Sequence, residues 1–130
     1  MKIIFKYFLI LFTVLLYVSG CQADKPEINI SAEEFLDLNE TTESLILDVR
    51  TNSEYSSGHL ENAVLLNLRA SDFSQKIKEL DKNKTYYVYC LSGVRSRSAV
   101  VKMRKEGITK AYNIKGGINA LMRNGATLTK

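Results

Sequence analysis

Residues 85–96, Thr-Tyr-Tyr-Val-Tyr-Cys-Leu-Ser-Gly-Val-Arg-Ser, contain the pattern that decides the fold. The first five are β-branched or aromatic, which is typical of a buried strand. Gly93 allows a tight loop after the strand. Apolar residues then recur at helical spacing over residues 95–106, and Gly107 is suited to end that helix. A strand that passes through a tight loop into a helix predicts one unit of an α/β fold.

The remainder of the chain repeats this alternation of strand and helix. Most of the expected strands are uninterrupted apolar runs, which favours a parallel sheet covered on both faces. We therefore predict an α/β fold with an open, twisted, mainly parallel sheet of about five strands and helices on both faces. The other expected strands are 28–30, 45–47, 63–66 and 111–114, and the other expected helices are 31–38, 51–57, 71–80 and 118–123.

The first twenty residues differ from the rest of the chain. Residues 1–6 contain two lysines and no acid, and residues 7–18 are almost wholly apolar. A basic start, a short apolar run and small residues before a cleavage point indicate an export signal. The apolar run is shorter than the roughly 20 residues that a membrane-spanning helix needs. Val18-Ser19-Gly20-Cys21 resembles the lipobox of bacterial lipoproteins, which implies cleavage before Cys21 and lipid attachment to its sulfur.

This interpretation divides the chain into three parts: a signal peptide at 1–20, a lipidated cysteine and tether at 21–27, and one domain at 28–130. The alternative is an uncleaved membrane anchor with an incidental cysteine. Both place the domain outside the cytoplasm, held to the bacterial cell membrane or outer membrane.

Cysteine usage supports a reactive thiol. The chain has two cysteines, and lipidation of Cys21 would leave Cys90 without a partner. An unpaired cysteine in an exported protein indicates either a reactive thiol or an intermolecular bond.

The net charge excludes one class of partner, nucleic acid. Without Lys2 and Lys6, the number of Lys and Arg residues falls from 18 to 16, against 14 Asp and Glu residues. That balance is too weak for a nucleic-acid surface.

Cys90 is the candidate nucleophile because it follows a strand at the sheet edge where ligands bind. Gly93 lets backbone N–H groups turn inward, and the positive end of the next helix faces the same loop. This field should lower the pKa of the Cys90 thiol. Arg95 adds a fixed charge suited to an oxyanion. The alternative, a buried structural cysteine, does not explain the glycine loop and the arginine.

The chain resembles the single-domain rhodaneses in three motifs that occur in the expected order. The active-site loop of that family is similar to Cys90-x-x-Gly93-x-Arg95-Ser96. The resemblance extends over roughly residues 30–125. The remaining matching segments are 47–50, 54–55, 58–60 and 63–64 upstream, and 112–114 with 116–117 downstream.

The resemblance implies a sulfurtransferase with a covalent two-step mechanism. The Cys90 thiolate would take the outer sulfur of a donor such as thiosulfate, and a thiol, cyanide or a thioredoxin-like protein would accept it. Arg95 would hold the departing oxyanion. No metal or cofactor is implied. The loop groups expected to bind the sulfur and substrate through their backbone belong to Leu91, Ser92, Gly93, Val94 and Ser96.

Four polar residues are expected to support the site. We interpret Asp48, Arg50 and Glu54 as one polar cluster that pins the loops near Cys90. His59, the single histidine, is expected to be a hydrogen-bonded structural residue rather than a metal ligand. The chain departs from the family at Leu121, where tryptophan is usual, and at 61–62, where glycine or proline is common, so we expect altered packing there.

Three other functions remain open. Phosphatases and arsenate reductases with a related cysteine loop need five residues between cysteine and arginine, whereas four separate Cys90 from Arg95. A non-enzymatic binding module is a second possibility, although such modules have often lost the cysteine. An exported redox or sulfur carrier that forms mixed disulfides through Cys90 is the third.

Overall fold

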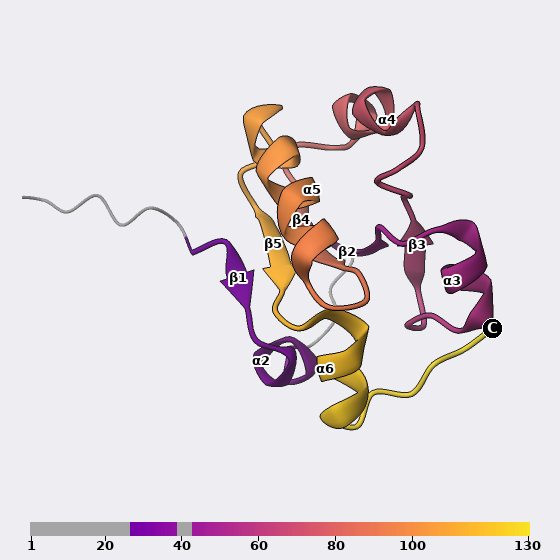
Figure 1. The fold of residues 1–130 in the computed structure, drawn as a ribbon. Helices are drawn as coiled ribbons and strands as arrows, with labels where there is room; N and C mark the ends of the chain where they lie inside the picture. Colours follow the sequence, from indigo (N-terminus) through magenta and orange to yellow (C-terminus); the bar gives the residue numbers. More distant parts are fainter. Residues whose placement is uncertain (1–26, 39–42) are drawn as a thin grey trace, which may run out of the picture.

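Strand β4 (Thr85–Tyr89) lies at the centre of a five-stranded sheet whose order is β1-β5-β4-β2-β3. Every neighbouring pair is parallel, so the predicted α/β fold is confirmed. The computed structural model describes residues 27–38 and 43–130 (Figure 1). The other elements are β1 (Asn29–Ile30), α2 (Ala32–Leu36), β2 (Ser44–Asp48), α3 (Asn52–Ser57), β3 (Ala63–Leu65), α4 (Phe73–Glu79), α5 (Val94–Lys105), β5 (Ala111–Ile114) and α6 (Gly117–Arg123).

Helices cover both faces of the sheet, as expected. One face packs against α4 and α5, and α5 crosses β4 and β5 in Figure 1. The other face packs against α2, α3 and α6. Alternate residues of β4 pack into the hydrophobic cores on opposite faces of the sheet. Tyr86 and Val88 belong to the core under α4 and α5, and Tyr87 and Tyr89 belong to the core under α2, α3 and α6. Cys90 continues the first series and therefore lies under α5.

The helix ends follow local sequence signals. A capping box joins Ser31 and Glu34 at the start of α2, and a second joins Thr51 and Glu54 at the start of α3. The helix expected over 31–38 is shorter in the structure, where it ends at Leu36. Leu36 and Leu38 are exposed, since α2 ends at Leu36 after little more than one turn and turns only one face inward.

The predicted signal peptide at 1–20 and Cys21 lie outside the described residues. Within 27–38 and 43–130, no helix has both the length and the apolar character needed to cross a membrane.

The two departures from the family pattern have local physical accounts. Leu121 belongs to α6 and is fully buried in the core that α2 and α6 form with the sheet. Asn62 has a φ of 61°, in the left-handed region that asparagine tolerates better than most residues, just before β3.

Leu121→Ala should therefore destabilise the fold by about 2–5 kcal/mol, because it removes buried methyl groups and leaves a cavity. Met122, its neighbour in α6, is 52% exposed, and Met122→Ala should change stability by no more than about 0.5 kcal/mol. Urea unfolding followed by circular dichroism measures both. Equal losses would contradict the assignment of Leu121 to the core.

Candidate functional site

Cys90 lies at the carboxyl end of the central strand and is 1% exposed. Its loop packs on the turn that starts α6. Ile118 N–H donates to the Cys90 carbonyl at 2.8 Å, and Asn119 N–H donates to that of Leu91 at 3.2 Å. These two bonds hold the loop in a single position beside β5.

Glycines make this close approach of two backbones possible. A Cβ on Gly117 would meet the carbonyl oxygen of Cys90 and lie 2.8 Å from that of Leu91. A Cβ on Gly93 would lie 2.9 Å from the backbone nitrogen of Gly116. All three glycines also have positive φ. In the sequence, Gly116 and Gly117 stood out only as a segment that matches the family pattern, and their contact with the Cys90 loop is a finding of the structure.

The sulfur of Cys90 is surrounded by hydrogen-bond donors. Gly93 N–H donates to Sγ at 3.1 Å, and the Ser96 hydroxyl lies 3.4 Å from it. Burial raises the pKa of the thiol, but bonds from the Ser96 hydroxyl and from the backbone N–H groups of Ser96, Ser92 and Gly93 outweigh that effect. The pKa of Cys90 therefore lies below its ordinary value.

The start of α5 supplies further donors. The first helical backbone bond runs from Arg97 N–H to the Gly93 carbonyl. The N–H groups of Val94, Arg95 and Ser96 precede that bond and have no carbonyl of their own helix to meet. An anion that forms on the sulfur would therefore face the positive end of a twelve-residue helix.

A buried polar chain leads from the sulfur to the edge of the sheet. The Ser96 hydroxyl donates to Asn113 Oδ1 at 2.6 Å, and Asn113 Nδ2 donates to Asn29 Oδ1 at 2.9 Å. Ser96 and Asn113 are both buried. Sequence reasoning missed both asparagines, because nothing in a single chain shows that residues 29 and 113 lie side by side in β1 and β5.

The structure divides the predicted cluster of Asp48, Arg50 and Glu54. Glu54 forms a two-bond ion pair with Arg95, at 2.8 and 2.7 Å. The bonds from Arg95, opposed by burial and helped by Thr51, lower the pKa of Glu54 to about 2. Glu54 in turn raises the pKa of Arg95, as does the Cys90 thiolate more weakly. Arg95 is therefore held between α3 and the sulfur.

Asp48 and Arg50 pair with each other, deeper in the protein. Arg50 Nη2 lies 2.6 Å from Asp48 Oδ2 and donates to the Gly58 carbonyl at 2.7 Å. The Tyr89 hydroxyl accepts from Leu60 N–H at 3.1 Å, and burial raises the pKa of that phenol. The Asp48–Arg50 pair thus fastens the loop around Gly58.

His59 lies in the same loop. Its ring stacks on Tyr55, with centroids 3.6 Å apart, and its Nδ1 lies 3.0 Å from the Tyr55 carbonyl. Its backbone exchanges two bonds of 2.9 Å with Thr129 near the end of the chain. Within residues 27–38 and 43–130, no three His, Cys, Asp or Glu side chains come together as metal ligands would.

The arrangement suits nucleophilic chemistry at sulfur. A thiol with a lowered pKa lies in a ring of N–H donors, and a fixed guanidinium stands beside it. Such a cradle stabilises negative charge on the thiolate and on any sulfur bonded to it.

Comparison with known proteins agrees with this geometry. A family model described as "Rhodanese-like domain" matches residues 31–124. A tRNA uridine(34) hydroxylase of Aster yellows witches'-broom phytoplasma is 38% identical over 93 residues, which cover 68% of this chain and 30% of that protein. The chain therefore corresponds to less than a third of that relative.

Solved structures match over most of their own length. A rhodanese-like domain protein from Staphylococcus aureus is 31% identical, with a TM-score of 0.66, over 78% of this chain and 98% of that one. A rhodanese-related protein from Thermoplasma volcanium is 27% identical, with a TM-score of 0.68, over 78% and 96%.

The Glu54–Arg95 pair makes stability depend on pH in a defined direction. Because the folded-state pKa of Glu54 is about 2 rather than its usual 4.5, the carboxylate stabilises the fold above pH 4.5, and this contribution is lost as the pH falls toward 2. The stability difference between the parent and Glu54→Gln should therefore shrink over that range. Urea midpoints measured at several pH values check this.

Glu61→Gln is the matched control, since Glu61 is exposed and forms no ion pair among the described residues. A difference for Glu54→Gln that stays constant from pH 4.5 to 2 would show that the pair does not hold in solution.

Proposed function

Because the chain belongs to the rhodanese-like domain family, we propose that it is a sulfurtransferase in which Cys90 carries a sulfane sulfur from a donor such as thiosulfate to a thiophilic acceptor. The observation that supports this most is the position of the Cys90 sulfur, at the centre of backbone and hydroxyl donors that lower its pKa.

In the first step, the Cys90 thiolate attacks the outer sulfur of thiosulfate. A bond forms between the two sulfurs, the S–S bond of the donor breaks, and sulfite leaves with the bonding electron pair. In the second step, cyanide or a thiolate attacks the outer sulfur of the persulfide, and the Cys90 thiolate leaves. The reaction needs no general base when the thiol is already ionised, and no cofactor.

The loop would stabilise the intermediate. The persulfide moves the negative charge one atom outward, toward the mouth of the cradle formed by residues 91–96. There the N–H groups of Val94, Arg95 and Ser96, which have no carbonyl partner within α5, would face it. Leu91, Ser92 and Gly93 would complete the ring.

Arg95 would act on the leaving group. Two of its donors bond to Glu54, which fixes the plane of the guanidinium and leaves its other N–H groups for an oxygen of the sulfite. In this proposal Glu54 positions Arg95, and the Asp48–Arg50 pair and His59 support the neighbouring loop.

A second candidate comes from the relatives. Proteins named tRNA uridine(34) hydroxylase share 38% and 34% identity with parts of this chain, but the chain covers 30% and 33% of them. Hydroxylation of a tRNA uridine would require this domain to contain the part of those proteins that performs the reaction. The Cys90 cradle is explained by either activity, so the experiment must separate the two.

We further propose that the protein is exported and anchored to a bacterial membrane through lipid on Cys21, with 21–27 as tether and 28–130 as the catalytic domain. The sequence Val18-Ser19-Gly20-Cys21 supports this. The acceptor would then be a small thiol, cyanide or a thioredoxin-like protein outside the cytoplasm.

With Cys21→Ala in the full chain, Cys90 is the one remaining thiol. Incubated with thiosulfate, this protein should gain the mass of one sulfur atom, and cyanide should release that sulfur as thiocyanate. Adding Cys90→Ala should abolish both, because the nucleophile is gone. Intact-mass spectrometry and a thiocyanate assay measure the two steps.

A folded protein that takes up no sulfur from thiosulfate or from organic persulfides would refute sulfur transfer. Addition of one oxygen atom to uridine 34 of a tRNA, lost on Cys90→Ala, would then favour hydroxylation. Mixed disulfides with exported proteins, without any persulfide, would favour a redox carrier.

Metabolic labelling with an alkyne palmitate tests the anchor. The full chain and its Cys90→Ala variant should both take up the label in bacterial cells, whereas Cys21→Ala should not, because the lipid is bound through that sulfur. Equal labelling of Cys21→Ala would contradict the anchor.

A further inference from the structure

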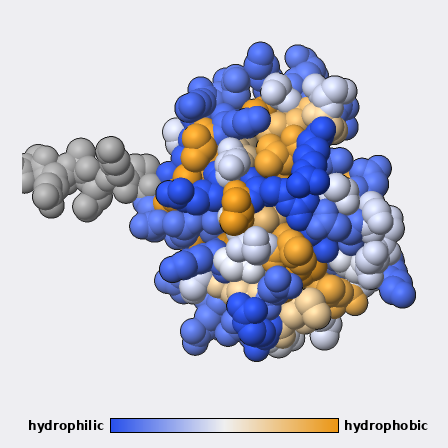
Figure 2. Space-filling view, in the orientation of Figure 1, coloured by the Kyte–Doolittle hydropathy of each residue, from blue (hydrophilic) through white to orange (hydrophobic). Residues whose placement is uncertain are grey.

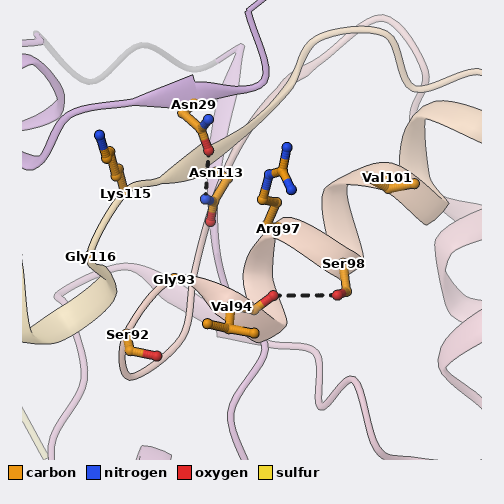
Figure 3. A pocket seen from close by; sticks show the side chains of 10 residues that line it. All are labelled: Asn29, Ser92, Gly93, Val94, Arg97, Ser98, Val101, Asn113, Lys115 and Gly116. Atoms are coloured by element: carbon orange, nitrogen blue, oxygen red, sulfur yellow. Dashed lines mark hydrogen bonds between the residues drawn. The ribbon is translucent and has the colours of Figure 1, made fainter.

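A pocket of about 500 Å³ lies between β1, β5 and the first half of α5. Figure 3 shows Asn29 and Asn113 between Arg97 on one side and Lys115 on the other. Ser92, Gly93 and Val94 of the Cys90 loop form one wall, but Cys90 and Arg95 do not line the pocket. The pocket therefore shares part of the Cys90 loop with the cradle but includes neither the sulfur nor Arg95.

The charge of this pocket is positive. Arg97 and Lys115 are its two charged residues, and no acid lines it within the described part of the chain. Neither side chain takes part in an ion pair or hydrogen bond with any residue of 27–38 or 43–130. A second pocket, of about 670 Å³ beside α2, has the opposite character, with Glu27, Glu34 and Asp37 in its lining.

An apolar strip completes the lining. Val94 is 71% exposed and Val101 is 38% exposed, although both belong to α5. Figure 2 shows hydrophobic atoms interrupting the hydrophilic surface on the face that presents α5. A ligand with a short carbon skeleton would cover these side chains while its charged ends met the two cations.

The floor of the pocket is connected to the sulfur. Asn113 is 2% exposed, and its Oδ1 accepts the bond from the Ser96 hydroxyl. One N–H of its amide is bonded to Asn29, so the other can donate to a ligand. Ser96 has a single hydroxyl proton, and Asn113 at 2.6 Å competes for it with the Cys90 sulfur at 3.4 Å.

We propose that this pocket binds a compact molecule with two anionic groups, carboxylate or phosphate, one at Arg97 and one at Lys115, and that its binding makes Cys90 less reactive through Asn113 and Ser96. An anion that accepts a bond from the Asn113 amide strengthens the pull of Oδ1 on the Ser96 proton. The thiolate then loses part of a stabilising bond. The added negative charge acts in the same direction. Neither Cys90 nor Arg95 lines this pocket, and the inference does not depend on sulfur transfer.

Calorimetry on the full chain with Cys21→Ala, in detergent and at constant ionic strength, tests the site. Succinate and pyrophosphate are the probes, and they distinguish carboxylate from phosphate recognition. Acetate is the single-charge control. At least one probe should bind saturably, and Arg97→Gln with Lys115→Gln should weaken it at least about tenfold, the equivalent of about 1.4 kcal/mol.

Lys105→Gln with Lys110→Gln is the matched control, because it removes the same charge from exposed positions outside the pocket. It should leave binding unchanged. The absence of saturable binding of either probe, or equal weakening by the two pairs of substitutions, would overturn the site.

Alkylation of Cys90 by iodoacetamide, an uncharged reagent, tests the link to the sulfur. The saturating probe should slow alkylation at neutral pH and have little effect at high pH, where the thiol is ionised in either case. The slowing should be smaller in Ser96→Ala, which removes the shared proton. Binding without any change in the pH profile of alkylation would overturn the link while leaving the site.

Discussion

The contact between two turns of backbone, at residues 90–93 and 116–117, is the constraint on which the rest of the site depends. Ile118 and Asn119 donate to the carbonyls of the Cys90 loop, and Gly117 leaves no room for a side chain between them. Because the carbonyls of the loop are bound outward in this way, its N–H groups are left to face the sulfur. Main-chain groups thus position and stabilise the Cys90 thiolate, and side chains such as Ser96 lower its pKa further.

Two ion pairs then hold the surroundings at different depths. The Asp48–Arg50 pair is almost fully buried, and it binds the carbonyl of Gly58, so its role is to define a loop. The Glu54–Arg95 pair is partly exposed and adjoins the sulfur, so its charge remains accessible to a substrate. The residues predicted as a single cluster therefore form two ion pairs, one that holds a loop and one that lies beside the reactive sulfur.

Local sequence patterns predicted the elements that depend on interactions between neighbouring residues. The strand 111–114, a helix that begins after residue 30 and the strand-loop-helix around Cys90 were all predicted, because each follows from neighbouring residues. The polar chain through Asn113 was not, since it depends on the register of strands far apart in sequence. The exposure of Leu36 also escaped prediction, because where a short helix ends is decided by tertiary packing.

The pairing of β1 with β5 has a consequence for how the domain is completed. Strand β1 pairs with β5, and the paired residues Asn29 and Asn113 are separated by nearly the whole described chain. Contacts of such sequence separation slow folding, and the edge of the sheet cannot close before the last strand exists. During synthesis, β1 therefore cannot pair until β5 has been made. The buried amide bridge beside the sulfur is thus among the last features that a growing chain can assemble.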